Sequence, residues 1–291
     1  MTITFQGGLL PPVRTKPRAK LAPHLRATTA VPASVDWYGN VAVWPMYLND
    51  QLGDCTEAMV GHNIQAASTY GDGATATITD NDVLTAYERV SGYRPGHPDT
   101  DQGAVLQDVY NDWRKTGVGG HKILAFAEVD VSDLEEVKAA VYVFGSVGLG
   151  IVVTQQMEDD FNAGRGWARA GGWKLGGHAV VVVGYDAEGV WLVTWGSVIT
   201  MTWAVFAKVV DEAWVGVLPE WINDTSGRTP LDVDLYGLGE VLAALTGEPN
   251  PFQPDPDPGP VPEPPVPAPG PDAADLALAA AVKTWEQAKG I

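Results

Sequence analysis

The chain has 291 residues and a formal net charge of −18, with 18 Lys and Arg against 36 Asp and Glu. This charge argues against a protein that coats nucleic acid or an anionic membrane surface. The single cysteine, Cys55, excludes an intramolecular disulfide and a zinc site of the CxxC type. Cys55 is therefore either a buried apolar side chain or a working thiol, and we expect no metal and no cofactor.

The sequence contains no apolar run long enough to cross a membrane, and its first residues lack the charged and apolar regions of a signal peptide. We therefore expect a soluble protein without a signal peptide, either cytoplasmic or part of a larger particle. The length allows one large domain or two small ones, so composition has to place the boundaries.

Composition divides the chain into five parts. Residues 1–31 hold five basic residues and no acidic one, which indicates an extended basic arm. Residues 32–223 form the folded body, and 224–248 a short helical extension. The proline-rich segment 249–271 is a stiff linker, and 272–291 form an Ala-rich C-terminal helix. Because neither end can build a core alone, we expect the arm and the C-terminal helix to contact other protein chains.

Helices are expected in the first half of the body. Asp54 and Glu57 have the spacing of a capping box, which predicts a helix that begins at Cys55 and runs to about residue 68. Further helices are predicted over 80–90 and 105–115, and a second capping box at 132–135 predicts a fourth.

The second half of the body changes to the pattern of strands. Valine-rich runs predict buried strands over 148–153, 178–185 and 190–195, with turns at Gly171-Gly172 and Gly176-Gly177. A short helix over 202–212, a strand over 214–217 and a helical stretch over 235–245 follow. Early helices and late antiparallel strands predict an α+β body with two lobes.

A thiol on the first residue of a helix lies where unpaired amides and the helix dipole favour the thiolate. We therefore expect the pKa of Cys55 to lie below the ordinary thiol value, although the charge of Asp54 opposes this effect. His178, at the entry to a predicted strand, is the candidate base. Each residue alone is more often structural, and His62 is best explained as a packed histidine.

Four motifs in order resemble those of the papain-like cysteine peptidases: Pro32-Ala-Ser-Val-Asp-Trp, Gly53-Asp-Cys-Thr, Gly177-His-Ala-Val and Thr194-Trp-Gly. The second motif is similar to a bacterial or phage-type variant of the family. The resemblance covers about two-thirds of the chain. It implies a two-lobed fold with a helical first lobe and an antiparallel second lobe, and a thiol nucleophile, Cys55, paired with His178.

Two departures from the family pattern bear on activity. The family has an Asn that orients the histidine, and this chain has Val193 there, with Thr194 as the nearest polar residue. Asn49 stands at the position of the family's oxyanion Gln, and Gln51 lies two residues later. Either amide could stabilise an oxyanion together with the Cys55 backbone N–H.

Two functions compete. The first is a cysteine peptidase or amidase acting on a protein or peptide substrate, with Cys55 as nucleophile and His178 as base. The second is a non-enzymatic papain-fold protein of a larger assembly, such as a capsid- or tail-associated phage virion protein. Because residues 1–31 are shorter than the family's usual inhibitory propeptide, we expect no zymogen control of that kind.

Overall fold

The computed structural model describes residues 2–25, 31–221, 235–246 and 249–252. These segments belong to one compact unit within residues 1–253. The predicted C-terminal helix 272–291 and all but the first four residues of the predicted linker 249–271 lie outside the described residues. No helix within the described ranges has the length and apolarity that a membrane crossing requires.

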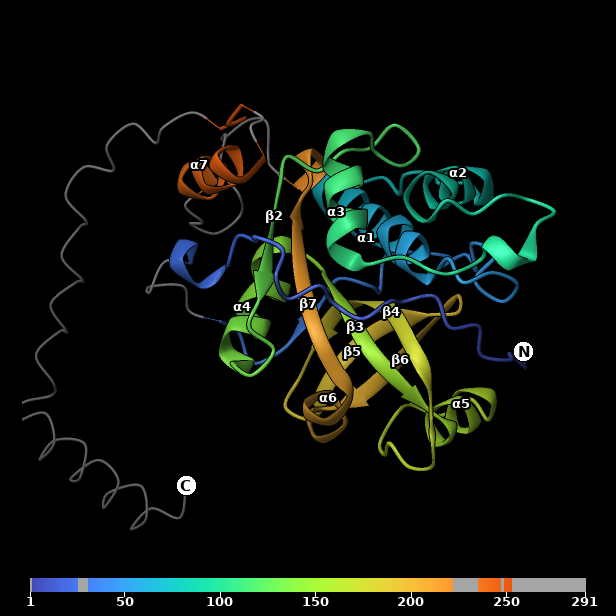
Figure 1. Cartoon of the computed structure of the whole chain (residues 1–291). Helices are drawn as coiled ribbons and strands as arrows, with labels where there is room; N and C mark the ends of the chain where they lie inside the picture. Colours follow the sequence, from blue (N-terminus) through green and yellow to red (C-terminus); the bar gives the residue numbers. More distant parts are fainter. Residues whose placement is uncertain (1, 26–30, 222–234, 247–248, 253–291) are drawn as a thin grey trace, which may run out of the picture. The chain divides into compact units, whose positions relative to one another are not determined.

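Three helices form the first lobe: α1 (Cys55–Gly71), α2 (Asp80–Ser91) and α3 (Leu106–Lys115). Figure 1 shows them gathered on one side of the sheet, with α1 between the other two and the strands. Residues 55–68 of α1 are buried around the whole helix. This burial on all faces is typical of a helix that fills the junction between two layers.

The second lobe is an antiparallel sheet with the strand order β2-β7-β3-β4-β5-β6, and β1 pairs with β4. Its strands are β1 (Val35–Asp36), β2 (Ala125–Val129), β3 (Val147–Thr154), β4 (Lys174–Tyr185), β5 (Gly189–Thr194), β6 (Ser197–Thr202) and β7 (Val210–Val217). Buried valines dominate the central strands, because β-branched side chains pack well on a pleated surface. The arrangement confirms the predicted α+β fold with a helical and an antiparallel lobe.

Seven further helical segments complete the described part of the chain. They are η1 (Ala22–His24), η2 (Pro98–Thr100), α4 (Leu134–Phe144), α5 (Gln155–Asn162), α6 (Trp203–Val209), η3 (Pro219–Trp221) and α7 (Leu235–Thr246). The lobes meet where α1 packs against β4, and Tyr110 of α3 donates a hydrogen bond to the Trp214 carbonyl of β7 at 3.0 Å. The contacts place the first turn of α1 beside the middle of β4.

Several helix caps and boundaries of helices and strands differ from those that the sequence predicts. Asp54 does not cap α1, because its carboxylate accepts from Asn49 instead. Asp133 is the residue that caps α4, one position after the predicted Ser132. Gly176 and Gly177 lie within β4 and not in a turn. The predicted helix 202–212 ends at Val209, just before β7 begins, and strands β1, β2 and β6 were not predicted.

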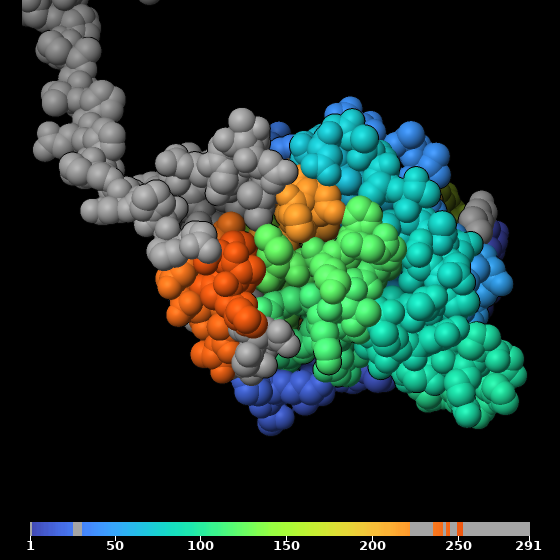
Figure 2. Space-filling view, turned by 90° about the horizontal axis from the view of Figure 1, so that it is seen from above, coloured from blue at the N-terminus to red at the C-terminus, as the bar shows by residue number. Residues whose placement is uncertain are grey.

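The basic arm packs on its own body, and its expected contacts with other chains stay a prediction. Glu128 of β2, a buried carboxylate, forms ion pairs with Arg14 (3.1 Å), Arg18 (3.3 Å) and Lys20. The backbone of Glu128 also exchanges hydrogen bonds of 2.9 Å with residues 19 and 21 of the arm. Further along the arm, η1 contacts α7, which lies at the same edge of the body (Figure 2).

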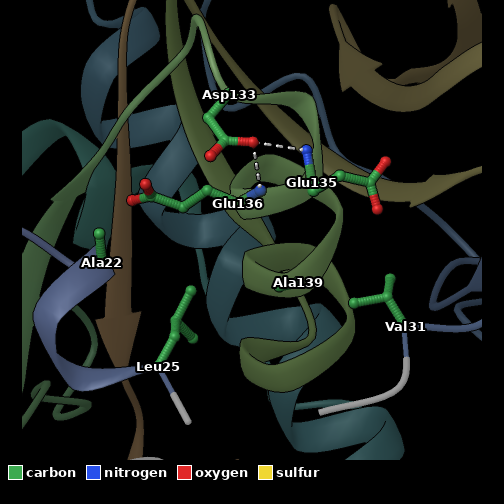
Figure 3. A pocket seen from close by; sticks show the side chains of 7 residues that line it. All are labelled: Ala22, Leu25, Val31, Asp133, Glu135, Glu136 and Ala139. Atoms are coloured by element: carbon green, nitrogen blue, oxygen red, sulfur yellow. Dashed lines mark hydrogen bonds between the residues drawn. The ribbon is translucent and has the colours of Figure 1, made fainter. Parts of the chain in front are cut away.

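The cap of α4 offers a direct test of the local structure. Figure 3 shows the Asp133 carboxylate accepting from the amides of Glu135 and Glu136, at 3.0 and 3.2 Å. Replacing Asp133 with Ala leaves these amides unpaired, so we expect a loss of about 1 kcal/mol in the free energy of unfolding. Urea denaturation measures it. Ser132→Ala is the matched control, and an equal loss in both variants would contradict the cap assignment.

Candidate active site

Cys55 is the first residue of α1, and its side chain is fully buried. The backbone N–H of Ala179, in β4, donates to the Cys55 sulfur at 3.3 Å. This bond joins the start of the central helix to the strand that carries His178. The structure thus brings together the two residues that the sequence predicts as thiol and base.

His178 is buried in β4, and its Nε2 shares a hydrogen bond of 2.8 Å with the Thr194 hydroxyl. Its Nδ1 has no hydrogen-bond partner among the described residues. If Nε2 carries the proton and donates it to Thr194, Nδ1 is the free acceptor. In this structure Nδ1 and the Cys55 sulfur do not form a hydrogen bond.

Trp195 fixes the plane of the imidazole. Its ring stacks on His178 with centroids 4.5 Å apart and planes 16° apart. Trp195 has a φ of +44°, a left-handed conformation that is strained for an aromatic residue, at the turn between β5 and β6. The turn holds Thr194 against one edge of the imidazole and Trp195 against its face.

The arm crosses the cleft over this site. Leu9 N–H donates to the Gly177 carbonyl of the strand lobe at 3.3 Å. On the helical lobe, Ala104 N–H donates to the Gly8 carbonyl and Leu10 N–H donates to the Ala104 carbonyl, both at 2.9 Å. Residues 8–10 therefore bridge the two lobes, and this arm, although short, covers the thiol.

Phe5 extends the cover beyond the cleft. Its ring lies edge-on to His178, with centroids 6.0 Å apart, and its N–H donates to Glu158 of α5 at 2.7 Å. Ile3 exchanges two hydrogen bonds with the Asn162 side chain of the same helix, at 2.7 and 3.0 Å. Burial of His178 thus depends in part on the first residues of the arm.

Burial controls the protonation of both groups. It raises the pKa of Cys55 well above the ordinary thiol value, with the carboxylates of Asp54 and Glu57 adding to the effect and backbone N–H bonds from Ala179 and Gly8 opposing it. It also lowers the pKa of His178 to about 3. The covered pair is therefore a neutral thiol and a neutral imidazole, and the predicted lowering of the Cys55 pKa is wrong for this closed state.

The two candidate oxyanion amides differ in position. Asn49 is buried, and its Nδ2 donates to the Asp54 carboxylate at 3.2 Å, directly before the thiol residue. Gln51 is exposed, and its amide contacts the Asp50 carboxylate at 3.4 Å. Asn49 is the amide that lies against the loop leading into Cys55.

Sequence reasoning missed the residues that hold this loop. The Asp101 carboxylate accepts from the Gly53 N–H, at 3.1 and 3.2 Å for its two oxygens, and also from the Tyr87 hydroxyl. The Tyr87 hydroxyl in turn accepts from the Gly103 N–H at 3.0 Å. No sequence pattern predicts this pair, because Tyr87 lies on α2 and Asp101 lies in the loop that follows.

No cluster of His, Cys, Asp and Glu in the described part of the chain could hold a metal ion. A separate hollow lies between η1 and α4 (Figure 3), and its lining residues are Ala22, Leu25, Val31, Asp133, Glu135, Glu136 and Ala139. It contains none of the predicted site residues, so the cleft that the arm fills is the candidate site.

Glu57, two residues after the thiol, gives the site a pH-dependent stability. Burial raises its pKa from 4.5 to about 8, with the Thr56 hydroxyl opposing the shift. The folded state thus keeps a proton that the unfolded chain releases, so stability present below pH 4.5 is lost as pH rises towards 8. We expect wild type to lose about 1 kcal/mol more per pH unit than Glu57→Gln between pH ~5 and ~8.

Urea denaturation of both proteins across this pH range measures the difference. Glu57→Gln also removes the Glu57 charge that helps to raise the pKa of Asp54, so the difference between the two proteins includes that part of the Asp54 shift. Parallel stability curves for wild type and Glu57→Gln would show that Glu57 is already ionised in the folded state.

The closeness of the arm predicts how the thiol reacts. A Cβ added at Gly8 would lie 1.9 Å from the Gly53 carbonyl oxygen, whereas one at Gly7 would meet the edge of the Phe5 side chain at 3.1 Å and then atoms beyond 3.5 Å. We expect Gly8→Ala to expel the arm and to speed alkylation of Cys55 by iodoacetamide about tenfold or more, because an uncovered thiol ionises more readily. Gly7→Ala is the matched control, and equal rates for the two variants would contradict this prediction.

No protein-family model matches the chain, and no curated protein sequence matches it. Solved structures do resemble its fold. Xylellain, a cysteine protease from Xylella fastidiosa, superposes with a TM-score of 0.56 at 16% identity, over 75% of this chain and 97% of that protein.

Two further structures agree. A proCathepsin B from Trypanosoma congolense gives a TM-score of 0.51 at 14% identity, over 73% of this chain and 86% of its own. The digestive procathepsin L 3 of Tenebrio molitor gives 0.50 at 14% identity, over 69% and 76%. The chain therefore has the papain-like fold.

Proposed function

We propose that the chain is a cysteine peptidase or amidase whose nucleophile is Cys55 and whose general base is His178. One observation carries the proposal: the Thr194 hydroxyl engages Nε2 of His178 and leaves Nδ1 unpartnered, one residue from the amide that bonds the Cys55 sulfur. A buried imidazole with one nitrogen held and the other free is the arrangement that a general base requires. Xylellain, a cysteine protease with the same fold, supports the assignment.

The reaction would take two steps. In the first, the Cys55 sulfur bonds to the substrate carbonyl carbon as its proton moves to His178 Nδ1, and the C–N bond breaks as that proton passes to the departing amine. In the second, water attacks the thioester carbon and gives one proton to His178, the C–S bond breaks as that proton passes to the sulfur, and the carboxylic acid leaves. Thr194 acts in both as the residue that holds the imidazole in one tautomer.

The developing oxyanion would lie at the start of α1. The Cys55 N–H belongs to the first turn of the helix, whose amides have no intrahelical partner. Asn49 is the favoured second donor, because it lies against the same loop and is held by Asp54, whereas Gln51 points to solvent. A donor held in place before reaction stabilises an oxyanion most effectively.

The alternative function is a structural papain-fold protein of a larger assembly, such as a phage virion. The observation that favours it is the closed cleft: Cys55 and His178 are fully covered, and Nδ1 does not contact the sulfur through a hydrogen bond. In that case the arm is a permanent part of the core, and the C-terminal segments provide the contacts with other proteins.

Turnover of fluorogenic peptide amides by the full chain, in the Gly8→Ala background, separates the two functions. We expect hydrolysis that Cys55→Ala abolishes and that His178→Ala lowers about a hundredfold or more. Thr194→Ala should lower kcat about tenfold with KM unchanged, because it loosens the base without removing it, and Thr194→Ser should restore most of the rate.

The serine variant is the control for a purely structural effect, since it keeps the hydroxyl and loses only the methyl group. If Thr194→Ala and Thr194→Ser are equally slow, Thr194 has no orienting role. If no variant hydrolyses any peptide, and His178→Ala leaves the alkylation rate of Cys55 unchanged, the structural function replaces the enzymatic one.

A further inference from the structure

We infer that the cleft accepts glycine, and excludes residues with a side chain, at the substrate position that lies over Cys55. The inference rests on the proposed function and names its substrate class: peptides or protein segments with a glycine at the bond to be cleaved. It comes from the way in which the arm fits the cleft, because Gly8 lies against Gly53, two residues before Cys55, and its carbonyl accepts from the Ala104 N–H.

The walls around Gly8 are backbone and lie very close. A Cβ on Gly8 would lie 1.9 Å from the Gly53 carbonyl oxygen and 2.7 Å from the Gly53 Cα. On the opposite wall, a Cβ on Gly103 would lie 2.2 Å from the Gly8 carbonyl oxygen. Real Cβ atoms do not approach other atoms this closely, so the occupant residue at Gly8 and the wall residue Gly103 must both be glycine.

Hydrogen bonds hold the two walls, Gly53 and Gly103, in place. The Asp101 carboxylate holds the Gly53 amide, and the Tyr87 hydroxyl holds the Gly103 amide, while Tyr87 also donates to Asp101. The Asp54 carbonyl, one residue further, accepts the first helical bonds of α1 at 3.0 Å. Moving either wall would therefore break a partly buried hydrogen-bond network or the first turn of the central helix.

The strand lobe closes the third side. Gly177 accepts from Leu9 N–H, and a Cβ on Gly177 would lie 2.3 Å from the Leu9 carbonyl oxygen. The main chain of the occupant is thus gripped by both lobes at the residues around the thiol. At Gly7 the space is open to a Cβ apart from the Phe5 ring, so the strict requirement applies to the residue over the sulfur.

The test uses the full-length Gly8→Ala chain, whose own arm leaves the cleft, and synthetic heptapeptides with the sequence of arm residues 4–10, Thr-Phe-Gln-Gly-Gly-Leu-Leu. Each peptide is scored by how far it protects Cys55 from iodoacetamide. We expect the parent peptide, and the peptide with Ala for its first Gly, to slow alkylation about tenfold. This factor corresponds to about 1.4 kcal/mol of free energy. At the same concentration the peptide with Ala for its second Gly should give no protection.

Equal protection by the peptide with Ala for its second Gly, or no protection by any peptide, overturns the inference. Leu9→Pro provides a second background in case Gly8→Ala lacks a cooperative thermal transition, since it removes the Leu9 N–H that bonds the Gly177 carbonyl but no wall of the passage.

The rate of peptide hydrolysis tests the glycine requirement independently. Among fluorogenic peptides that differ only in the residue before the leaving group, we expect kcat/KM for Gly to exceed that for Ala about tenfold or more. Equal values for Gly and Ala overturn the inference and leave the proposed function standing. Selective protection without turnover of any peptide supports the glycine-selective cleft and overturns the proposed function.

Discussion

The meeting of α1 with β4 is the constraint on which the rest of the structure depends. The Ala179 amide bonds the Cys55 sulfur, so the first residue of the central helix and the middle of the central strand are fixed to one another. Every face of the first turns of α1 is buried between the two lobes, and His178, the residue before Ala179, lies near the thiol. Lobe packing, the thiol and the base are one arrangement.

The arm exploits the same junction. Its basic residues pair with Glu128 on β2, and its glycines pass between the lobes over the sulfur. A buried carboxylate needs cationic partners more than an exposed one does, because burial removes its water. The ion pairs with Glu128 therefore fix the position of the arm along the body. Burial in the cleft then keeps the thiol and the imidazole neutral. The closed state therefore lacks the thiolate that would act as nucleophile.

The fold could be predicted from the sequence where the signal is regular. The valine-rich runs identify β3, β4 and β5, and the motifs around Cys55 and His178 identify the two lobes. The Thr194 contact with His178 follows from the predicted Thr194-Trp-Gly motif, although its geometry does not. What could not be predicted depends on residues distant in sequence: the hold of Asp101 on Gly53, and the seat of Gly8 between Gly53 and Gly103. Such contacts produce no periodic pattern of residues in the sequence from which they could be predicted.

The central claim is that Cys55 and His178 form a reactive pair that the arm keeps neutral. Ultraviolet absorbance of the thiolate, measured against pH with Cys55→Ala as the blank, tests it most directly. Wild type should show no thiolate up to pH ~9, because its buried thiol titrates above the ordinary value of about 8.5, and Gly8→Ala should show thiolate near pH ~6 that His178→Ala abolishes. A thiolate in wild type at neutral pH, or identical titrations in both chains, would contradict the account.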